Sequence, residues 1–148
     1  MKPKLIVMVG ISGSGKSTFA NGLKTSLNAT VIETDGIRAE LFGDANDQSQ
    51  GGRVFGVAKK RVADSLDQGK NTVIDATSLT PRDRKDWVNI ALGHGATPEA
   101  YVVKTDLATA KKRNGMRHRQ VPEFVIDKQF AKFSVPTKAE GFDNITIV

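Results

Sequence analysis

The chain has 148 residues, which suits one domain with a real hydrophobic core and leaves too little sequence for a separate regulatory domain. It contains no cysteine, which excludes disulfides and thiolate metal sites, and its 39% apolar and 26% charged residues are ordinary for a globular domain. The net charge is +6, and residues 104–119 alone hold a local excess of five positive charges. A basic balance of this kind favours polyanionic partners.

The first residues indicate neither a leader peptide nor a membrane anchor. Only five apolar residues, 5–9, precede a glycine-rich turn, and this run is too short for a signal-peptide core or a transmembrane helix. We therefore expect a cytoplasmic protein without a membrane partner.

The glycine-rich turn is a phosphate-binding motif. Residues 10–17 read Gly-Ile-Ser-Gly-Ser-Gly-Lys-Ser and fit the pattern G-x-x-x-x-G-K-[ST], between the apolar run 5–9 and a helical pattern over 19–27. Glycines let successive backbone N–H groups turn toward an anion, and a helix N-terminus adds partial positive charge. We expect Lys16 to reach the β- and γ-phosphates of a nucleoside triphosphate and Ser17 to bind Mg²⁺. An incidental Gly-Lys-Ser in a strand-to-helix turn is the weaker alternative.

The rest of the chain alternates strand and helix patterns. This order predicts an α/β fold of the P-loop NTPase kinase type, with a five-stranded, mainly parallel sheet flanked by helices in one domain, residues 1–148. The four further strands are predicted at 30–34, 71–75, 100–103 and 144–148. Helices are predicted at 37–42, 53–68, 80–93, 105–114 and from 122 onward, and the polar segment 43–52 is predicted to be a mobile surface loop.

Two of these helices have informative residues. Thr80, Pro81 and Asp83 predict a helix start with a capping box, and Trp87 is predicted to lie in the core. In the last helix the residues expected to pack are Phe124, Val125, Phe130 and Phe133.

Ligands of an open parallel sheet bind beyond the carboxyl ends of its strands. Asp35 and Arg38 follow the second strand, and their spacing of three residues would put both side chains on one face if the helix began at Asp35. Such a carboxylate can accept the proton of an attacking hydroxyl, and the guanidinium can hold a phosphate of the acceptor. Alternatively, Asp35 caps the helix and Arg38 pairs with Glu40 or Asp44. Asp75 ends the third strand and is expected to support Mg²⁺ or its waters, with capping or a turn as its alternative role.

The basic stretch 111–119 favours a lid. Arginines on a movable segment can close over a transferring phosphoryl group and neutralise its charge, which we expect of two of these arginines in a lid at about 113–121. The alternative is a solvated run of charges. His118 is expected at the surface and His94 in a turn.

The chain resembles, almost end to end, the polynucleotide 5′-kinase family and the small P-loop "predicted kinase" proteins of bacteria and phages grouped with it. The residues that carry the resemblance are 10–18 (Gly-Ile-Ser-Gly-Ser-Gly-Lys-Ser-Thr), 34–38 (Thr-Asp-Gly-Ile-Arg), 41–43 (Leu-Phe-Gly), 73–77 (Val-Ile-Asp-Ala-Thr), 113–117 (Arg-Asn-Gly-Met-Arg), 121–123 (Val-Pro-Glu) and 136–143 (Pro-Thr-Lys-Ala-Glu-Gly-Phe-Asp). Their order and spacing are specific to the group.

The resemblance implies a role for each matching position. Asp35 matches the general base, Arg38 the residue that grips the neighbouring phosphate of the nucleic acid strand, and Arg113 and Arg117 the lid arginines. Ser17 and Asp75 match the metal-binding positions. ATP would be bound by Gly10, Ser12, Gly13, Ser14, Gly15, Lys16, Ser17, Thr18, Arg113 and Arg117. The acceptor pocket would be shaped by Val121 and Pro122.

The resemblance fixes the reaction better than the acceptor. The predicted activity is transfer of the γ-phosphate of ATP, with Mg²⁺, to the 5′-hydroxyl end of DNA or RNA. Related viral enzymes instead phosphorylate hydroxymethylated pyrimidines within DNA, and a small-molecule or nucleoside kinase is a further alternative. A nucleotide-gated binding module is the alternative from outside the enzymes. Ser78 stands where the family often has Asn, and the Asp-x-Asp-Gly-Thr phosphatase signature of two-domain repair enzymes is missing.

Overall fold

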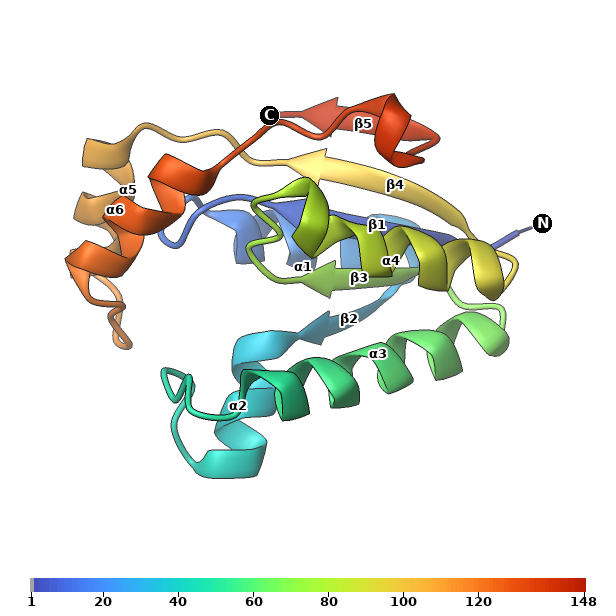
Figure 1. Cartoon of the computed structure of the whole chain (residues 1–148), viewed down its shortest axis with the longest axis horizontal. Helices are drawn as coiled ribbons and strands as arrows, with labels where there is room; N and C mark the ends of the chain where they lie inside the picture. Colours follow the sequence, from blue (N-terminus) through green and yellow to red (C-terminus); the bar gives the residue numbers. More distant parts are fainter. Residues whose placement is uncertain (1) are drawn as a thin grey trace.

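The computed structural model describes residues 2–148 and contains one five-stranded sheet in the order β2-β3-β1-β4-β5 (Figure 1). The strands are β1 (Lys4–Val9), β2 (Thr30–Glu33), β3 (Thr72–Asp75), β4 (Thr97–Val102) and β5 (Asn144–Ile147). The helices are α1 (Lys16–Leu27), α2 (Thr34–Phe42), α3 (Gly51–Asp67), α4 (Pro81–Gly93), α5 (Leu107–Gly115) and α6 (Glu123–Lys132), with a 3₁₀ turn η1 (Lys138–Glu140). All neighbouring strands are parallel, so the predicted α/β fold is confirmed.

The central strand β1 is buried on both faces, as its uninterrupted apolar sequence requires. Leu5, Val7 and Val9 belong to the core formed with α3 and α4, which includes Trp87. The alternate residues Ile6 and Met8 belong to a second core on the side of α1. The domain therefore has three layers, with α1 on one face of the sheet and α3 and α4 on the other (Figure 1).

Most element boundaries follow the sequence prediction, with one difference that bears on the site. The capping box of α4 is present, with Thr80 accepting from the N–H of Asp83 and the N–H of Thr80 donating to Asp83. By contrast, β2 ends at Glu33 and α2 begins at Thr34, so the chain turns helical directly at the edge of the sheet. This early start puts Asp35 in the first turn of α2.

The predicted packing of α6 is wrong for two of its aromatic residues. Phe124 is 61% exposed and Phe130 44% exposed, whereas Ile126 is fully buried. Because α6 contacts a small satellite core through a single narrow face, one aliphatic side chain fills the contact and both aromatic rings lie outside it. Within residues 2–148, no helix is both long and apolar enough to cross a membrane.

Candidate active site

The turn after β1 is shaped by glycines that no other residue could replace without strain. Gly13 and Gly15 have φ angles of +81° and +89°, in the left-handed region, and Lys16 is the first residue of α1. A Cβ atom on Gly13 would lie 2.2 Å from the carbonyl oxygen of Ala110 in α5. The turn is also fixed to the loop after β3, because the N–H of Gly10 donates to the carbonyl of Thr77 at 3.0 Å.

We expect Gly13→Ala to distort this turn. The new methyl group meets a backbone oxygen and the residue is held at positive φ, so the variant should lose about 1–3 kcal/mol of stability and should bind ATP more weakly. Urea unfolding and equilibrium ATP binding measure the two effects. Gly22→Ala is the matched control, because Gly22 lies within α1 with open space around it, so alanine there should not reduce stability. If the two variants had the same stability and the same affinity for ATP, the role assigned to Gly13 in shaping the turn would be wrong.

Lys16 and Ser17 end the phosphate-binding motif of residues 10–17, the P-loop. Both side chains contact Asp75, the last residue of β3. Ser17 Oγ donates to Asp75 Oδ2 at 2.8 Å, and Lys16 Nζ lies 3.2 Å from Asp75 Oδ1. The Asp75 side chain is only 3% exposed. Because β3 is the direct neighbour of β1, these three groups come together at the carboxyl edge of the sheet.

The Ser17 and Asp75 oxygens fit a magnesium ion. Among residues 2–148 no cluster of three acidic, histidine or cysteine side chains could hold a metal by itself. Mg²⁺ in nucleotide sites is normally held by one or two protein oxygens together with substrate phosphates and waters, so a hydroxyl and a carboxylate are a suitable donor set.

Asp35 lies two strands from the P-loop strand and still lines the same pocket. The pocket has a volume of about 990 Å³ and is also lined by Lys16 and Ser17. Arg38 Nη1 donates to Asp35 Oδ1 at 2.9 Å, and the Arg38 side chain is 9% exposed. The alternative in which Arg38 forms a solvated pair with Glu40 or Asp44 is therefore wrong: Arg38 points inward.

A third carboxylate at this edge, Glu33, escaped the sequence analysis because it lies within the predicted strand. Partial burial raises the pKa of Glu33 above its ordinary value, and the nearby negative charges of Asp75 and Asp35 raise it further, against the opposing effects of Lys16 and Arg119. The cause of the clustering is topological, since Glu33 and Asp75 are register partners at the ends of β2 and β3.

The basic stretch 111–119 contacts the P-loop at one end and Asp35 at the other. At its start, Arg113 Nη1 donates to the carbonyl of Ser14 at 2.9 Å. Asn114 then holds the turn closed through two hydrogen bonds with Val121, at 2.7 and 2.9 Å. Arg117 lines the pocket, as do Val121 and Pro122.

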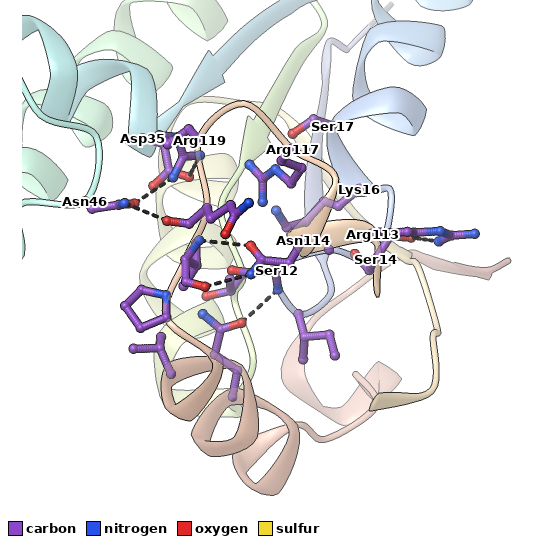
Figure 2. A pocket seen from close by; sticks show the side chains of 18 of the residues that line it. Ser12, Ser14, Lys16, Ser17, Asp35, Asn46, Arg113, Asn114, Arg117 and Arg119 are labelled. Atoms are coloured by element: carbon purple, nitrogen blue, oxygen red, sulfur yellow. Dashed lines mark hydrogen bonds and ion pairs between the residues drawn. The ribbon is translucent and has the colours of Figure 1, made fainter. Parts of the chain in front are cut away.

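Sequence reasoning missed three residues of this region. Arg119 Nη2 donates to Asp35 Oδ2 at 3.0 Å and Arg119 Nη1 to Asn46 Oδ1 at 2.7 Å (Figure 2). Gln129 of α6 accepts from the N–H of Ser12 at 2.7 Å. Arg119 belonged to the basic run but matched no motif, and for Asn46 and Gln129 the sequence offers no signal.

Comparison with known proteins identifies the class of domain. A family model described as an AAA domain matches residues 5–136. Among curated proteins, the chain is 24% identical over 147 residues to a bifunctional polynucleotide phosphatase/kinase of Schizosaccharomyces pombe, covering 96% of this chain and 32% of the relative. It is 31% identical over 153 residues to an adenylyl-sulfate kinase of Bacillus velezensis, covering 91% of this chain and 74% of the relative.

A solved structure is also similar to this chain. A chain in the structure of the Pnkp1/Rnl/Hen1 RNA repair complex superposes with a TM-score of 0.77 at 28% identity, covering 88% of this chain and 43% of that one. The present chain thus spans less than half of that protein and about a third of the fission yeast relative.

Proposed function

We propose that this chain, which belongs to the AAA domain family and is a P-loop kinase, transfers the γ-phosphate of ATP to the 5′-hydroxyl end of DNA or RNA. One observation carries the proposal: Asp35, with Arg38 beside it, lines the same pocket as Lys16 and Ser17. A binding module that only senses a nucleotide has no use for a carboxylate and a buried guanidinium facing its phosphate site.

The nucleotide side of the pocket is built from the P-loop and the start of the basic segment. The backbone of residues 10–18 surrounds the phosphates, and Lys16 reaches the β- and γ-phosphates. Arg113 and Arg117 stabilise the negative charge that spreads over the phosphoryl group during transfer. The contact of Arg113 with the carbonyl of Ser14 supports its position against the P-loop. Residues 113–121 accordingly act as the lid of a single kinase domain.

Ser17 and Asp75 would hold Mg²⁺ together with the phosphates of the nucleotide. When bound, the ion neutralises phosphate charge and orients the triphosphate. The short contact between Ser17 Oγ and Asp75 Oδ2 supports this pairing of ligands.

The acceptor side is built around Asp35. Its carboxylate takes the proton of the acceptor hydroxyl as the hydroxyl oxygen forms a bond to the γ-phosphorus. The bond from that phosphorus to the bridging oxygen breaks on the opposite side, and ADP leaves with the electron pair. Arg38 holds a phosphate of the acceptor next to the reacting hydroxyl.

The choice of a nucleic acid acceptor rests on charge and on the relatives. Residues 104–119, which include most of the lid segment, hold a local excess of five positive charges, which suits a polyanion. One relative is a polynucleotide phosphatase/kinase, and the superposed structure is an RNA repair complex. The adenylyl-sulfate kinase relative favours a second candidate, a kinase for a small phosphorylated or sulfated nucleotide. A hydroxymethylated pyrimidine within DNA is the remaining acceptor of the same chemistry.

Incubation with γ-labelled ATP and a panel of acceptors tests the proposal. The panel contains a 5′-hydroxyl DNA oligonucleotide, its RNA counterpart, a duplex containing hydroxymethyluracil, adenylyl sulfate and a set of nucleosides. Label is expected in the 5′-hydroxyl oligonucleotides. Label only in adenylyl sulfate or only in the modified duplex would replace the proposal with that activity. ATP binding without label in any acceptor would support the binding module instead.

A further inference from the structure

The lid segment presents a third arginine to the acceptor side of the pocket. Arg119 comes two residues after Arg117, and its guanidinium spans from Asp35 Oδ2, at 3.0 Å, to Asn46 Oδ1, at 2.7 Å. Figure 2 shows Arg119 between these two side chains. Its side chain is 30% exposed and therefore open to a ligand entering the pocket.

Arg119 and Arg38 occupy the two carboxylate oxygens of Asp35 separately. Arg38 Nη1 binds Oδ1, while Arg119 Nη2 binds Oδ2. The three side chains Asp35, Arg38 and Arg119 together carry one net positive charge. In addition, Arg38 Nε is buried and has no hydrogen-bond partner within the described part of the chain, so this donor is free for a further acceptor atom.

Two arginines of the lid thus face different parts of the pocket. Arg113 is directed to the P-loop through the Ser14 carbonyl, whereas Arg119 is directed to the proposed base Asp35. Asp35 follows β2, and β3 lies between β2 and the P-loop strand β1. A residue that binds only the nucleotide would therefore not be expected to contact Asp35.

Asn46 ties this arrangement to the loop 43–50. Its Oδ1 accepts from Arg119, and its Nδ2 donates to the carbonyl of Gln120 at 2.9 Å. The loop and the lid segment therefore meet across the acceptor side of the pocket, and Asn46 acts as a positioning residue that orients the Arg119 guanidinium.

We propose that Arg119 and Arg38 together bind a phosphate of the acceptor, and that this phosphate draws both guanidiniums away from Asp35 so that the carboxylate becomes free to take the hydroxyl proton. The inference rests on the proposed function, since it names the acceptor group that the same site recognises. The terminal phosphate of a nucleoside 3′-phosphate is a dianion that offers more charge and more acceptor oxygens than the carboxylate. A phosphodiester of a nucleic acid is a monoanion whose two non-bridging oxygens can accept from both guanidiniums, so either group competes with Asp35 for the two arginines. Coupling base release to phosphate binding selects acceptors that carry a phosphate next to the reacting hydroxyl.

Two acceptors that differ only in this phosphate test the proposal. Steady-state transfer is measured to a nucleoside 3′-phosphate and to the same nucleoside without phosphate, and the ratio of their kcat/KM values gives the phosphate preference. In Arg119→Ala the preference should fall about tenfold or more, through a higher KM for the phosphorylated acceptor, while the KM for ATP stays within about twofold. Transfer to the unphosphorylated nucleoside should not fall, because Asp35 has lost a competing partner.

The matched control is Lys112→Ala. It removes one positive charge from the same basic stretch at an exposed position outside the pocket, so the phosphate preference should be unchanged.

Combining Arg119→Ala with Arg38→Ala gives a double-mutant cycle, in which the losses should be less than multiplicative because both residues bind the same phosphate. Thermal unfolding midpoints show that each variant is folded.

Equal losses for the two acceptors in Arg119→Ala, or an increased KM for ATP alone, would overturn the inference. If the wild-type protein transfers phosphate to no nucleic acid or nucleoside, the proposed function is wrong, and direct binding then decides the inference by itself. Equilibrium binding of the nucleoside 3′-phosphate in the presence of ADP should still weaken about tenfold in Arg119→Ala. Unchanged binding of this probe, or none by the wild-type protein, would overturn it.

Discussion

Replacing Asp35 with asparagine is expected to lower phosphoryl transfer by about 10²- to 10⁴-fold while ATP binding is retained. Asparagine has nearly the same shape but cannot take the proton of the attacking hydroxyl. Within residues 2–148 the Asp35 carboxylate accepts hydrogen bonds from the Arg38 and Arg119 side chains only, so the substitution leaves the P-loop and its contacts with Asp75 in place. Single-turnover transfer and equilibrium ATP binding measure the two properties separately.

Glu40→Gln is the matched control for this variant. Glu40 is a carboxylate of the same helix, but it pairs with Arg61 on the surface, at 2.7 Å, and does not line the pocket. Its loss should leave both transfer and ATP binding unchanged. An Asp35→Asn protein with the turnover of the wild type would show that another group takes the proton, and Glu33, whose pKa is raised in the same pocket, would be the next residue to test.

Local sequence patterns predicted the fold and the glycine-rich turn before α1 well. The apolar run before residue 10, the glycines of the turn and the capping box at Thr80 each act over fewer than ten residues, so they can be read without tertiary information. Asp35 and Asp75 were also predictable, because parallel strands bring their carboxyl ends to one edge. Their proposed roles follow from chemistry and remain predictions.

The acceptor side was harder to predict because it depends on the paths of loops. Asn46 and Arg119 are 73 positions apart, and neither lies in a periodic pattern that would show which way its side chain points. The same holds for Gln129, which reaches Ser12 across 117 positions. Contacts of this kind arise from the docking of one segment on another, which short-range patterns do not encode.

Arg84 is the clearest case of a residue whose burial could not be predicted from the sequence. A charged residue in an amphipathic helix is expected to face solvent, yet Arg84 of α4 is fully buried. Its guanidinium pairs with Glu140 through Nε at 2.7 Å and Nη2 at 3.2 Å, and Nη1 donates to the carbonyls of Ser78 and Ser134 at 2.9 and 3.1 Å. It therefore joins η1 to the loop that follows β3, beside the P-loop.

Glu140→Gln is expected to lower the free energy of unfolding by about 3–5 kcal/mol, the largest stability loss we predict. The amide has the shape of the carboxylate but no charge, so the buried Arg84 guanidinium is left without a compensating anion. Such a loss is a large part of the 5–15 kcal/mol typical of a domain. Urea unfolding at pH 7 measures it. Asp86→Asn on the same helix is the matched control, because the Lys59–Asp86 pair is exposed and worth at most about 1 kcal/mol.

The stability difference should also depend on pH in a definite direction. Burial alone would raise the pKa of Glu140, but the Arg84 guanidinium and the hydrogen bonds from Thr137 outweigh it and hold the pKa below its ordinary value of 4.5. A carboxyl group with a lowered pKa stabilises the folded state above the unfolded pKa and loses this effect as the pH falls through the folded pKa. The difference between wild type and Glu140→Gln should therefore be full at pH 7 and shrink below pH 4.5. The prediction would be contradicted by a stability difference that stayed constant into acid, or by one no larger than that of Asp86→Asn. Either result would show that the Arg84–Glu140 pair does not stabilise the contact between η1 and the loop that follows β3.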